Sequence, residues 1–176
     1  TGNDSIAHQL GQAMTARGDI HLIGESLPLS GTASPLLHAH PDRCHLLPAA
    51  DATLVGIAIG LAMTGAKPVV ELSGPEALWG ALQQLGQESA ALKGEFSGTL
   101  VIRVPLRPED KSPLDVLDGL NQITVACASN SADAAVLVQA ALSQSRTTVL
   151  LEPITVLAAS GGVAGPADFE KAVIVD

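Results

Sequence analysis

The sequence predicts an α/β fold: a doubly wound, mostly parallel sheet with helices on both faces. Short runs rich in β-branched residues alternate along the chain with segments of helical periodicity. The strand runs are apolar on both sides, as strands are when helices cover both faces of a sheet. Together these two observations favour a parallel sheet over a sandwich or a helical bundle.

The N-terminal part predicts a helix, a strand and a loop. A helix over Ser5–Arg17 is indicated by three apolar residues at helical spacing, Ile6, Leu10 and Met14. Ser5 is a suitable N-cap for it. The strand Ile20–Glu25 follows, and then residues rich in Pro, Ser and Gly predict a loop as far as Pro35.

From there the pattern repeats to the end of the sheet. The predicted helices are Asp51–Thr64, Pro75–Lys93 and Ser131–Gln144. The predicted strands are Lys67–Leu72, Thr99–Leu106, Ile123–Ser129 and Thr147–Pro153. A polar connection, Arg107–Leu120, separates two of these strands. We expect one domain over residues 1–157, and a linker or the start of a further region over residues 158–176.

Composition excludes several classes of function. The 176 residues carry a net charge of -9 and only two Phe, one Trp and no Tyr, which argues against a nucleic-acid partner. No apolar run is long enough to span a membrane. The N-terminus lacks the pattern of a secretory signal, and Cys44 and Cys127 form no CxxC pair. A cytoplasmic location is therefore expected.

The helix predicted after Pro48 carries a stripe of small residues. Spacing by four places Ala52, Gly56, Gly60 and Thr64 on one face. Each interior glycine costs roughly 0.5–1 kcal/mol relative to alanine, so a close backbone approach is the usual compensation. The stripe fits either a tight helix-on-sheet contact within the domain or an interface with another subunit.

The segment around this helix resembles a known enzyme family. HPDRCHLLPAADATLVGIAIGLAMTGAKPVVEL, residues 40–72, is similar to the beta subunits of thiamine-diphosphate-dependent 2-oxoacid dehydrogenases, in their decarboxylase component. Residues 73–93 and TTVLLEP resemble later parts of the same transketolase-like, pyrimidine-binding domain, and Glu71 favours the dehydrogenase branch over transketolases. The resemblance extends from about Ser5 to Pro153.

In that family a glutamate hydrogen-bonds the pyrimidine ring of the cofactor and promotes its imino tautomer, which assists proton loss from the thiazolium ring. The resemblance places Asp51 at this position, as the catalytic and cofactor-binding carboxylate. An aspartate reaches about 1.5 Å less far than a glutamate, which matters against a hydrogen bond of about 2.8 Å. Asp51 is equally suited to be a helix N-cap.

Two other family features differ in this chain. The aromatic residue that packs on the pyrimidine ring matches Ala77, which cannot stack on a ring. Trp79 stands two residues further on, but successive helical positions do not share a face. The family's Gly-rich loop with a histidine matches residues 107–120, which hold no histidine.

The resemblance also implies a partner chain. The family binds diphosphate and Mg²⁺ through a Gly-Asp-Gly motif on a different domain or subunit, and this sequence contains no such motif. Thiamine diphosphate, with Mg²⁺ supplied by an alpha-like subunit, is therefore the expected cofactor, and a second copy of the chain is another expected partner. Family members continue into a C-terminal domain near where this sequence stops, which fits a truncated chain or a minimal relative.

Other candidate sites are weaker. His38, His40, Cys44 and His45 are zinc-ligand types at short spacing, but a zinc site needs three or four of them to converge, and we expect a solvated turn and no bound metal. No Gly-x-Ser-x-Gly elbow follows a strand, so a hydrolase is not expected. Two hypotheses stay open: a beta-like subunit active beside an alpha-like partner, and a catalytically degenerate paralogue that serves in assembly or regulation.

Overall fold

A computed structural model describes residues 2–25, 27, 30–48, 51–91, 98–117 and 123–155. The helices are α1 (Gly2–Ala16), α2 (Ala33–Ala39), α3 (Asp51–Met63), α4 (Pro75–Ala91), α5 (Leu114–Leu117) and α6 (Ser131–Ser143), with a 3₁₀ turn η2 (Pro41–Arg43). The strands are β1 (Ile20–Gly24), β2 (Cys44–Leu46), β3 (Lys67–Glu71), β4 (Leu100–Leu106), β5 (Ile123–Cys127) and β6 (Thr147–Pro153).

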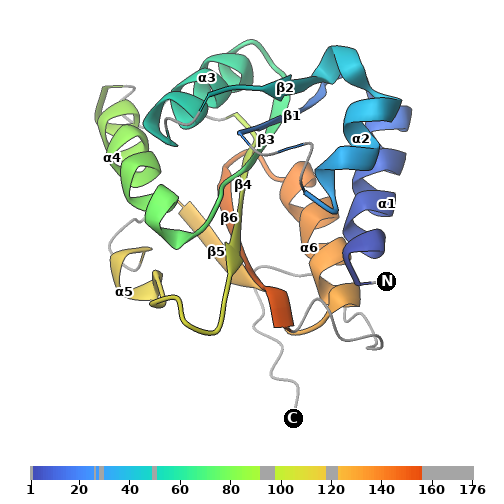
Figure 1. Ribbon diagram of the computed structural model, residues 1–176. Helices are drawn as coiled ribbons and strands as arrows, with labels where there is room; N and C mark the ends of the chain where they lie inside the picture. Colours follow the sequence, from blue (N-terminus) through green and yellow to red (C-terminus); the bar gives the residue numbers. More distant parts are fainter. Residues whose placement is uncertain are drawn as a thin grey trace.

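The strands form one six-stranded sheet in the order β2-β1-β3-β4-β6-β5, and every neighbouring pair is parallel. Helices α1, α2 and α6 lie on one side of the sheet, and α3, α4 and α5 lie on the other (Figure 1). The predicted fold class, a doubly wound parallel sheet with helices on both faces, is therefore confirmed.

Two separate cores correspond to the two faces. One gathers Ile6, Leu10 and Met14 of α1 with alternate residues of the strands. The other packs α3 and α4 against the opposite side of the same strands. The central strands are buried on both faces, which explains why their sequences read as continuous apolar runs.

Helix ends are fixed by local hydrogen bonds. At the end of α3, Gly65 adopts a positive φ of 88°, its N–H donates to the Ala62 carbonyl, and the Ala66 N–H donates to the Leu61 carbonyl. This is a Schellman motif, which favours glycine at the left-handed position. At the start of α6 the Asn130 side chain accepts from the backbone N–H groups of Ala132 and Asp133.

The structure corrects three details of the sequence prediction. Helix α1 starts at Gly2, so Ser5 lies inside the helix and is not its N-cap. The predicted loop gives way to α2 at Ala33, and a three-residue strand β2 follows it. The polar connection holds the single turn α5. The predicted linker, residues 158–176, lies outside the described residues. No helix in the described ranges is long and apolar enough to cross a membrane.

Candidate functional site

The chain reverses direction across the sheet between β1 and β3. After β1 it passes to α2 on one face, and after β3 it passes to α4 on the other face. In doubly wound folds the crevice at such a switch point, outside the carboxyl ends of the strands, is where ligands bind. The topology therefore selects the ends of β1 and β3 as the candidate site.

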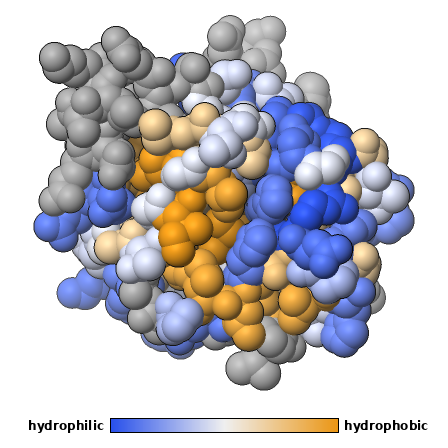
Figure 2. Space-filling view, turned by 90° about the horizontal axis from the view of Figure 1, so that it is seen from above, coloured by the Kyte–Doolittle hydropathy of each residue, from blue (hydrophilic) through white to orange (hydrophobic). Residues whose placement is uncertain are grey.

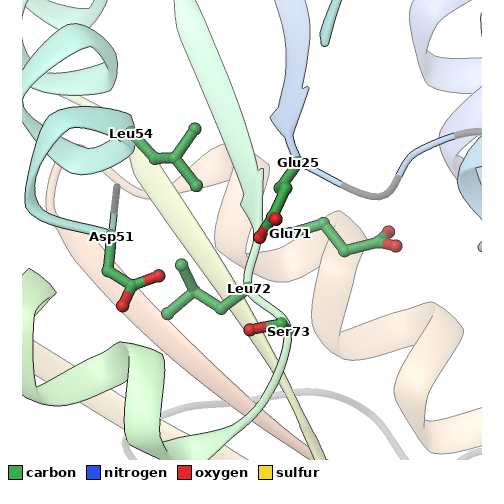
Figure 3. A pocket seen from close by; sticks show the side chains of 6 residues that line it. All are labelled: Glu25, Asp51, Leu54, Glu71, Leu72 and Ser73. Atoms are coloured by element: carbon green, nitrogen blue, oxygen red, sulfur yellow. The ribbon is translucent and has the colours of Figure 1, made fainter. Parts of the chain in front are cut away.

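A small pocket lies at this point. Its lining residues come from the ends of β1 and β3 and from the start of α3: Glu25, Asp51, Leu54, Glu71, Leu72 and Ser73. Figure 3 shows Asp51 on one side and Glu25 on the other, with Leu54 and Leu72 between them. The volume is about 20 Å³, room for about one water molecule. This chain alone could cover only part of a larger ligand.

Asp51 is the first residue of α3 and is half-buried. The position is favourable for a carboxylate, because the free N–H groups at a helix N-terminus carry partial positive charge. Gly80 of α4 permits the close approach of the two helices here, since a Cβ on Gly80 would lie 3.4 Å from the Asp51 Cβ. Asp51 is thus held at the pocket by the contact between α3 and α4.

Glu25 is the residue that sequence reasoning missed. It directly follows β1, is partly buried, and lines the pocket together with Asp51. Within the described part of the chain, neither carboxylate makes a hydrogen bond or an ion pair. Both are free to accept a hydrogen bond from a ligand.

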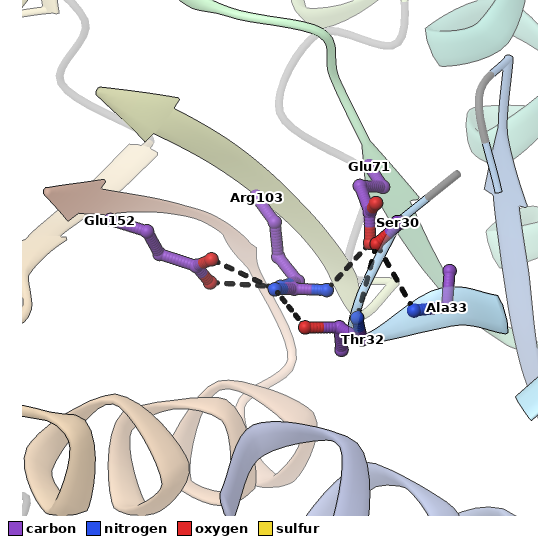
Figure 4. Close-up of polar contacts among 6 residues, drawn as sticks. All are labelled: Ser30, Thr32, Ala33, Glu71, Arg103 and Glu152. Carbon is purple, nitrogen blue, oxygen red and sulfur yellow. Dashed lines mark hydrogen bonds and ion pairs between the residues drawn. The ribbon is translucent and has the colours of Figure 1, made fainter. Parts of the chain in front are cut away.

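Glu71 lines the same pocket, but its carboxylate points to the other side of the sheet (Figure 3). There Arg103 Nη1 donates to Glu71 Oε2 at 2.8 Å, and Arg103 Nε and Nη2 donate to the two carboxylate oxygens of Glu152, each at 2.8 Å. Arg103 Nη2 also reaches Thr32 Oγ1 at 3.4 Å (Figure 4). The network ties β3, β4 and β6 to the start of α2.

This network is buried and internally satisfied. Arg103 and Glu152 are each 4% exposed. Burial alone lowers the pKa of Arg103, but the charges of Glu152 and then Glu71 outweigh it and hold that pKa above its ordinary value. Arg103 is therefore a permanent cation with two carboxylate partners, and each of its three guanidinium nitrogens already has a hydrogen-bond acceptor.

Ala77 does not line the pocket. It is 3% exposed and packs in the core between α4 and the sheet. Its neighbour Trp79 lies on the outer side of α4 and is 56% exposed. In the described part of the chain no aromatic side chain lines the pocket, so a cofactor-binding role for Ala77 stays a prediction.

The small-residue stripe of α3 faces away from the sheet. Leu54, Val55, Ala58, Ile59 and Ala62 make the sheet-facing side. Of the stripe, Ala52, Gly60 and Thr64 are exposed and Gly56 lies beside the Gln84 side chain of α4. A Cβ on Gly60 would meet nothing within 4 Å. A tight contact with the sheet therefore does not explain these glycines.

The outer face of α3 belongs to an apolar surface. Exposed large apolar residues include Leu46 on β2, Ile57 and Met63 on α3, and Trp79 on α4; Leu114 on α5 and Ile154 just after β6 are exposed as well. Apolar residues gather on the side of the molecule where α3 and β2 lie (Figures 1 and 2). From Ala52 to Ala66 the chain carries no charged residue. Apolar surface of this kind is typical of a contact with another chain.

The cluster of candidate zinc ligands does not converge. Cys44 is buried in the core on the α1 side, whereas the His45 ring faces His21 of β1. His38 Nδ1 lies 2.8 Å from the Ser34 carbonyl oxygen, and His40 Nδ1 accepts from Arg43. Within the described ranges, no group of three or more His, Cys, Asp or Glu side chains is arranged to hold a metal ion.

Comparison with known proteins shows the fold. No protein-family model matches the chain. Among solved structures, it is similar to a chain described as a split-gene transketolase in an inactive beta4 tetramer, with a TM-score of 0.66 and 16% sequence identity. The match covers 85% of this chain and 50% of that chain, so the present sequence spans about half the length of its structural relative.

Proposed function

We propose that the chain is a beta-subunit-like, pyrimidine-binding domain of a thiamine-diphosphate-dependent 2-oxoacid dehydrogenase or decarboxylase, active only beside an alpha-like partner. The observation that carries this proposal is the open carboxylate of Asp51 at the switch point of a transketolase-like fold. The resemblance of residues 40–72 to the dehydrogenase branch supports the choice of reaction class over transketolase chemistry.

The pocket suits one end of the cofactor. An aminopyrimidine offers N–H donors through its amino group, and a ring N–H as well once it is protonated or tautomerised, and the open carboxylates of Asp51 and Glu25 are acceptors for such donors. Leu54 and Leu72, which are 1% and 2% exposed, form the apolar wall of the pocket. The chemistry of the donor set therefore fits the pyrimidine end of thiamine diphosphate.

The same pocket does not suit the diphosphate. Its three ionisable residues, Glu25, Asp51 and Glu71, are all acidic, and the nearby cation Arg103 is already paired with two carboxylates. A diphosphate would be repelled here unless Mg²⁺ and cationic groups came from elsewhere. An alpha-like subunit that holds the diphosphate and Mg²⁺ across the interface meets this requirement.

When bound, thiamine diphosphate supplies a thiazolium carbon that can attack the carbonyl group of a 2-oxoacid. The part of this chain is to hold and orient the pyrimidine. Asp51 accepts a hydrogen bond from the ring and stabilises its protonated or imino form. Glu25 provides a second acceptor on the opposite side of the pocket, and Leu54 and Leu72 exclude water from part of the ring.

A second copy of the chain is the other partner that we propose. With a net charge of -9, two copies repel each other over most of their surface, but the face of α3 carries no charge. Exposed Ile57, Met63 and Trp79 border that face, and Gly60 leaves room for a close backbone approach. The beta4 assembly of the structural relative supports self-association of this kind.

The alternative is a degenerate paralogue that keeps the fold and the association face but not catalysis. The short carboxylate of Asp51 and the buried alanine at position 77 favour it, because both leave a pyrimidine ring less firmly held. The two functions share their partners and differ in cofactor binding. A measurement of cofactor binding therefore distinguishes the two functions.

The test is co-expression of the chain with the alpha-like protein of a neighbouring gene. The purified complex is titrated with thiamine diphosphate and Mg²⁺ by calorimetry, and turnover is measured on a panel of 2-oxoacids with an artificial electron acceptor. We expect binding that Asp51→Ala abolishes and the control Asp42→Asn, at an exposed position of η2, leaves unchanged.

Asp51→Glu sharpens the result, because the longer side chain restores about 1.5 Å of reach. It should tighten binding and raise turnover. A stable complex with no cofactor binding would select the degenerate paralogue, and turnover that survives Asp51→Ala would remove Asp51 from the reaction.

A further inference from the structure

Two histidines meet at the edge of the sheet formed by β1 and β2. His21 lies on β1 and His45 on the edge strand β2. His21 Nδ1 and His45 Nε2 are 3.0 Å apart, the ring centroids are 5.3 Å apart, and the ring planes differ by 13°. The two ring centroids are farther apart than the two nitrogens by about twice the distance from the centre of an imidazole ring to one of its own nitrogens. The rings therefore meet edge to edge, with the two nitrogens on the line between them.

This geometry accommodates a single proton between the rings. A neutral imidazole has one N–H donor and one acceptor nitrogen, so one ring donates and the other accepts. If both rings are protonated, every ring nitrogen carries a hydrogen, and two N–H groups point at each other across 3.0 Å. The hydrogen bond is then replaced by repulsion between two cations.

Among the described residues, the charged groups that act on His21 include no unpaired anion to offset a second charge. The charged groups that act on His21 besides His45 are Arg43 of η2 and Asp19, and Asp19 is already paired with Arg17 at 2.6 Å. On β3, the amino group of Lys67 donates to the Leu142 carbonyl of α6 on the other face. Helix α3 contributes no charged residue beyond Asp51 at its start.

The contact between His21 and His45 joins the short strand β2 to β1. β2 has three residues and a single neighbour, β1, and the Leu47 N–H donates to the Gly24 carbonyl just beyond it. A strand with so few backbone hydrogen bonds depends on side-chain contacts to stay on the sheet.

We propose that the His21–His45 hydrogen bond is a proton-sensitive clasp that holds β2 on the sheet and releases it when both rings become protonated. In the order of the chain, β2 is the element before α3, which carries the pocket carboxylate Asp51. The clasp does not depend on the proposed enzymatic function, since it rests on the geometry of the strand edge.

The pH range follows from the direction of the His21 shift. Burial, and then the charges of His45 and Arg43, lower the pKa of His21 from its ordinary value of 6.5, against a smaller opposite effect of Asp19. His21 therefore takes up a proton more readily when β2 is released than when β2 is docked. Docking is fully stabilised above pH 6.5 and weakens as the pH falls below it, through the lowered pKa of the docked state.

The experiment is NMR on the ¹⁵N-labelled chain between pH 7.5 and 5.0. At pH 7.5 we expect a scalar coupling between His21 Nδ1 and His45 Nε2 across the hydrogen bond. As the pH falls, hydrogen-exchange protection of the β2 amides, corrected for intrinsic rates, should drop about tenfold per unit of pKa difference, while β3 and β4 stay protected.

His45→Gln removes the partner ring and the contribution of its charge to the lowered pKa of His21, and should weaken the pH dependence of β2 protection in this range. The matched control His38→Gln, on α2 and away from β2, should keep the wild-type pH dependence. Absence of the coupling, or equal pH dependence in the wild type and His45→Gln, would overturn the clasp. If His45→Gln fails to fold, the coupling and the wild-type protection profile decide alone.

Discussion

The carboxylates at the carboxyl edge of the sheet differ between its two sides: those on the α2 side are paired with a cation, and, within the described residues, those on the α3 side are not. On the α2 side, Glu71 and Glu152 are bound to the buried Arg103, and each of its three guanidinium nitrogens has a carboxylate partner. On the α3 side, Asp51 and Glu25 line a pocket and have no partner among the described residues. The first pair serves the fold, and the second is available to a ligand.

This difference carries an energetic consequence. Removing one member of a buried ion pair leaves an uncompensated charge, whereas an open carboxylate at a pocket loses little when it is neutralised. Stability should therefore be sensitive to substitutions on the α2 side and nearly insensitive to those on the α3 side. Ligand binding should show the reverse.

The largest effect is expected for Arg103→Met. It leaves Glu71 and Glu152 without their cation, at a cost of about 3–5 kcal/mol in the free energy of unfolding. Urea denaturation measures it. The control Arg146→Met removes an exposed arginine that donates to the Thr124 hydroxyl, and should cost less than about 1 kcal/mol. Equal losses in the two variants would contradict the role given to Arg103.

Gly60→Ala is expected to change the free energy of unfolding by a smaller amount and in the opposite direction, so that the monomer becomes more stable. Its Cβ would meet nothing within 4 Å, so the monomer should gain about 0.5–1 kcal/mol from helix propensity. If α3 packs closely on a second copy, the same methyl group weakens assembly. Sedimentation velocity and the fluorescence of Trp79, the single tryptophan, report association.

The control for that experiment is Gly18→Ala, in the turn between α1 and β1, where a Cβ also meets nothing within 4 Å. It should leave association unchanged. Gly60→Ala that raises monomer stability and leaves association intact would exclude a close approach at Gly60.

The smallest effects on stability are expected for Asp51→Asn and Glu25→Gln. Neither carboxylate has a described partner, so each variant should change the free energy of unfolding by less than about 1 kcal/mol, including the loss of the helix-terminus interaction at Asp51. Thermal denaturation with and without the alpha-like partner measures this. A loss comparable to that of Arg103→Met would mean that these carboxylates are structural.

Much of the fold follows from local sequence pattern. The long strands and helices were predictable because β-branched runs and helical periodicity persist over enough residues to be read. Helix α2 was not predictable from the sequence, since Pro35 and its Ser- and Gly-rich surroundings favour a loop. Strand β2 was not, because alternation cannot be read from three residues.

The candidate site, too, could be predicted from the sequence only in part. The resemblance placed Asp51 at the start of its helix, and the structure places it at the pocket. Glu25 was missed because its importance depends on the strand order, which brings the end of β1 beside the end of β3. The sequence does contain a pattern from which the Arg103 network could have been predicted. A single charged residue interrupts each of the apolar segments VVEL, VIRVP and LLEP.

The most direct test of the account follows the carboxyl ¹³C signals of the chain in complex with the proposed alpha-like partner as thiamine diphosphate and Mg²⁺ are added. Signals are assigned with Asp51→Asn, Glu25→Gln and Glu71→Gln. We predict that the Asp51 and Glu25 signals shift with saturation while those of Glu71 and Glu152 stay in place. Cofactor binding that leaves the Asp51 signal unmoved would contradict the assignment of this pocket to the pyrimidine.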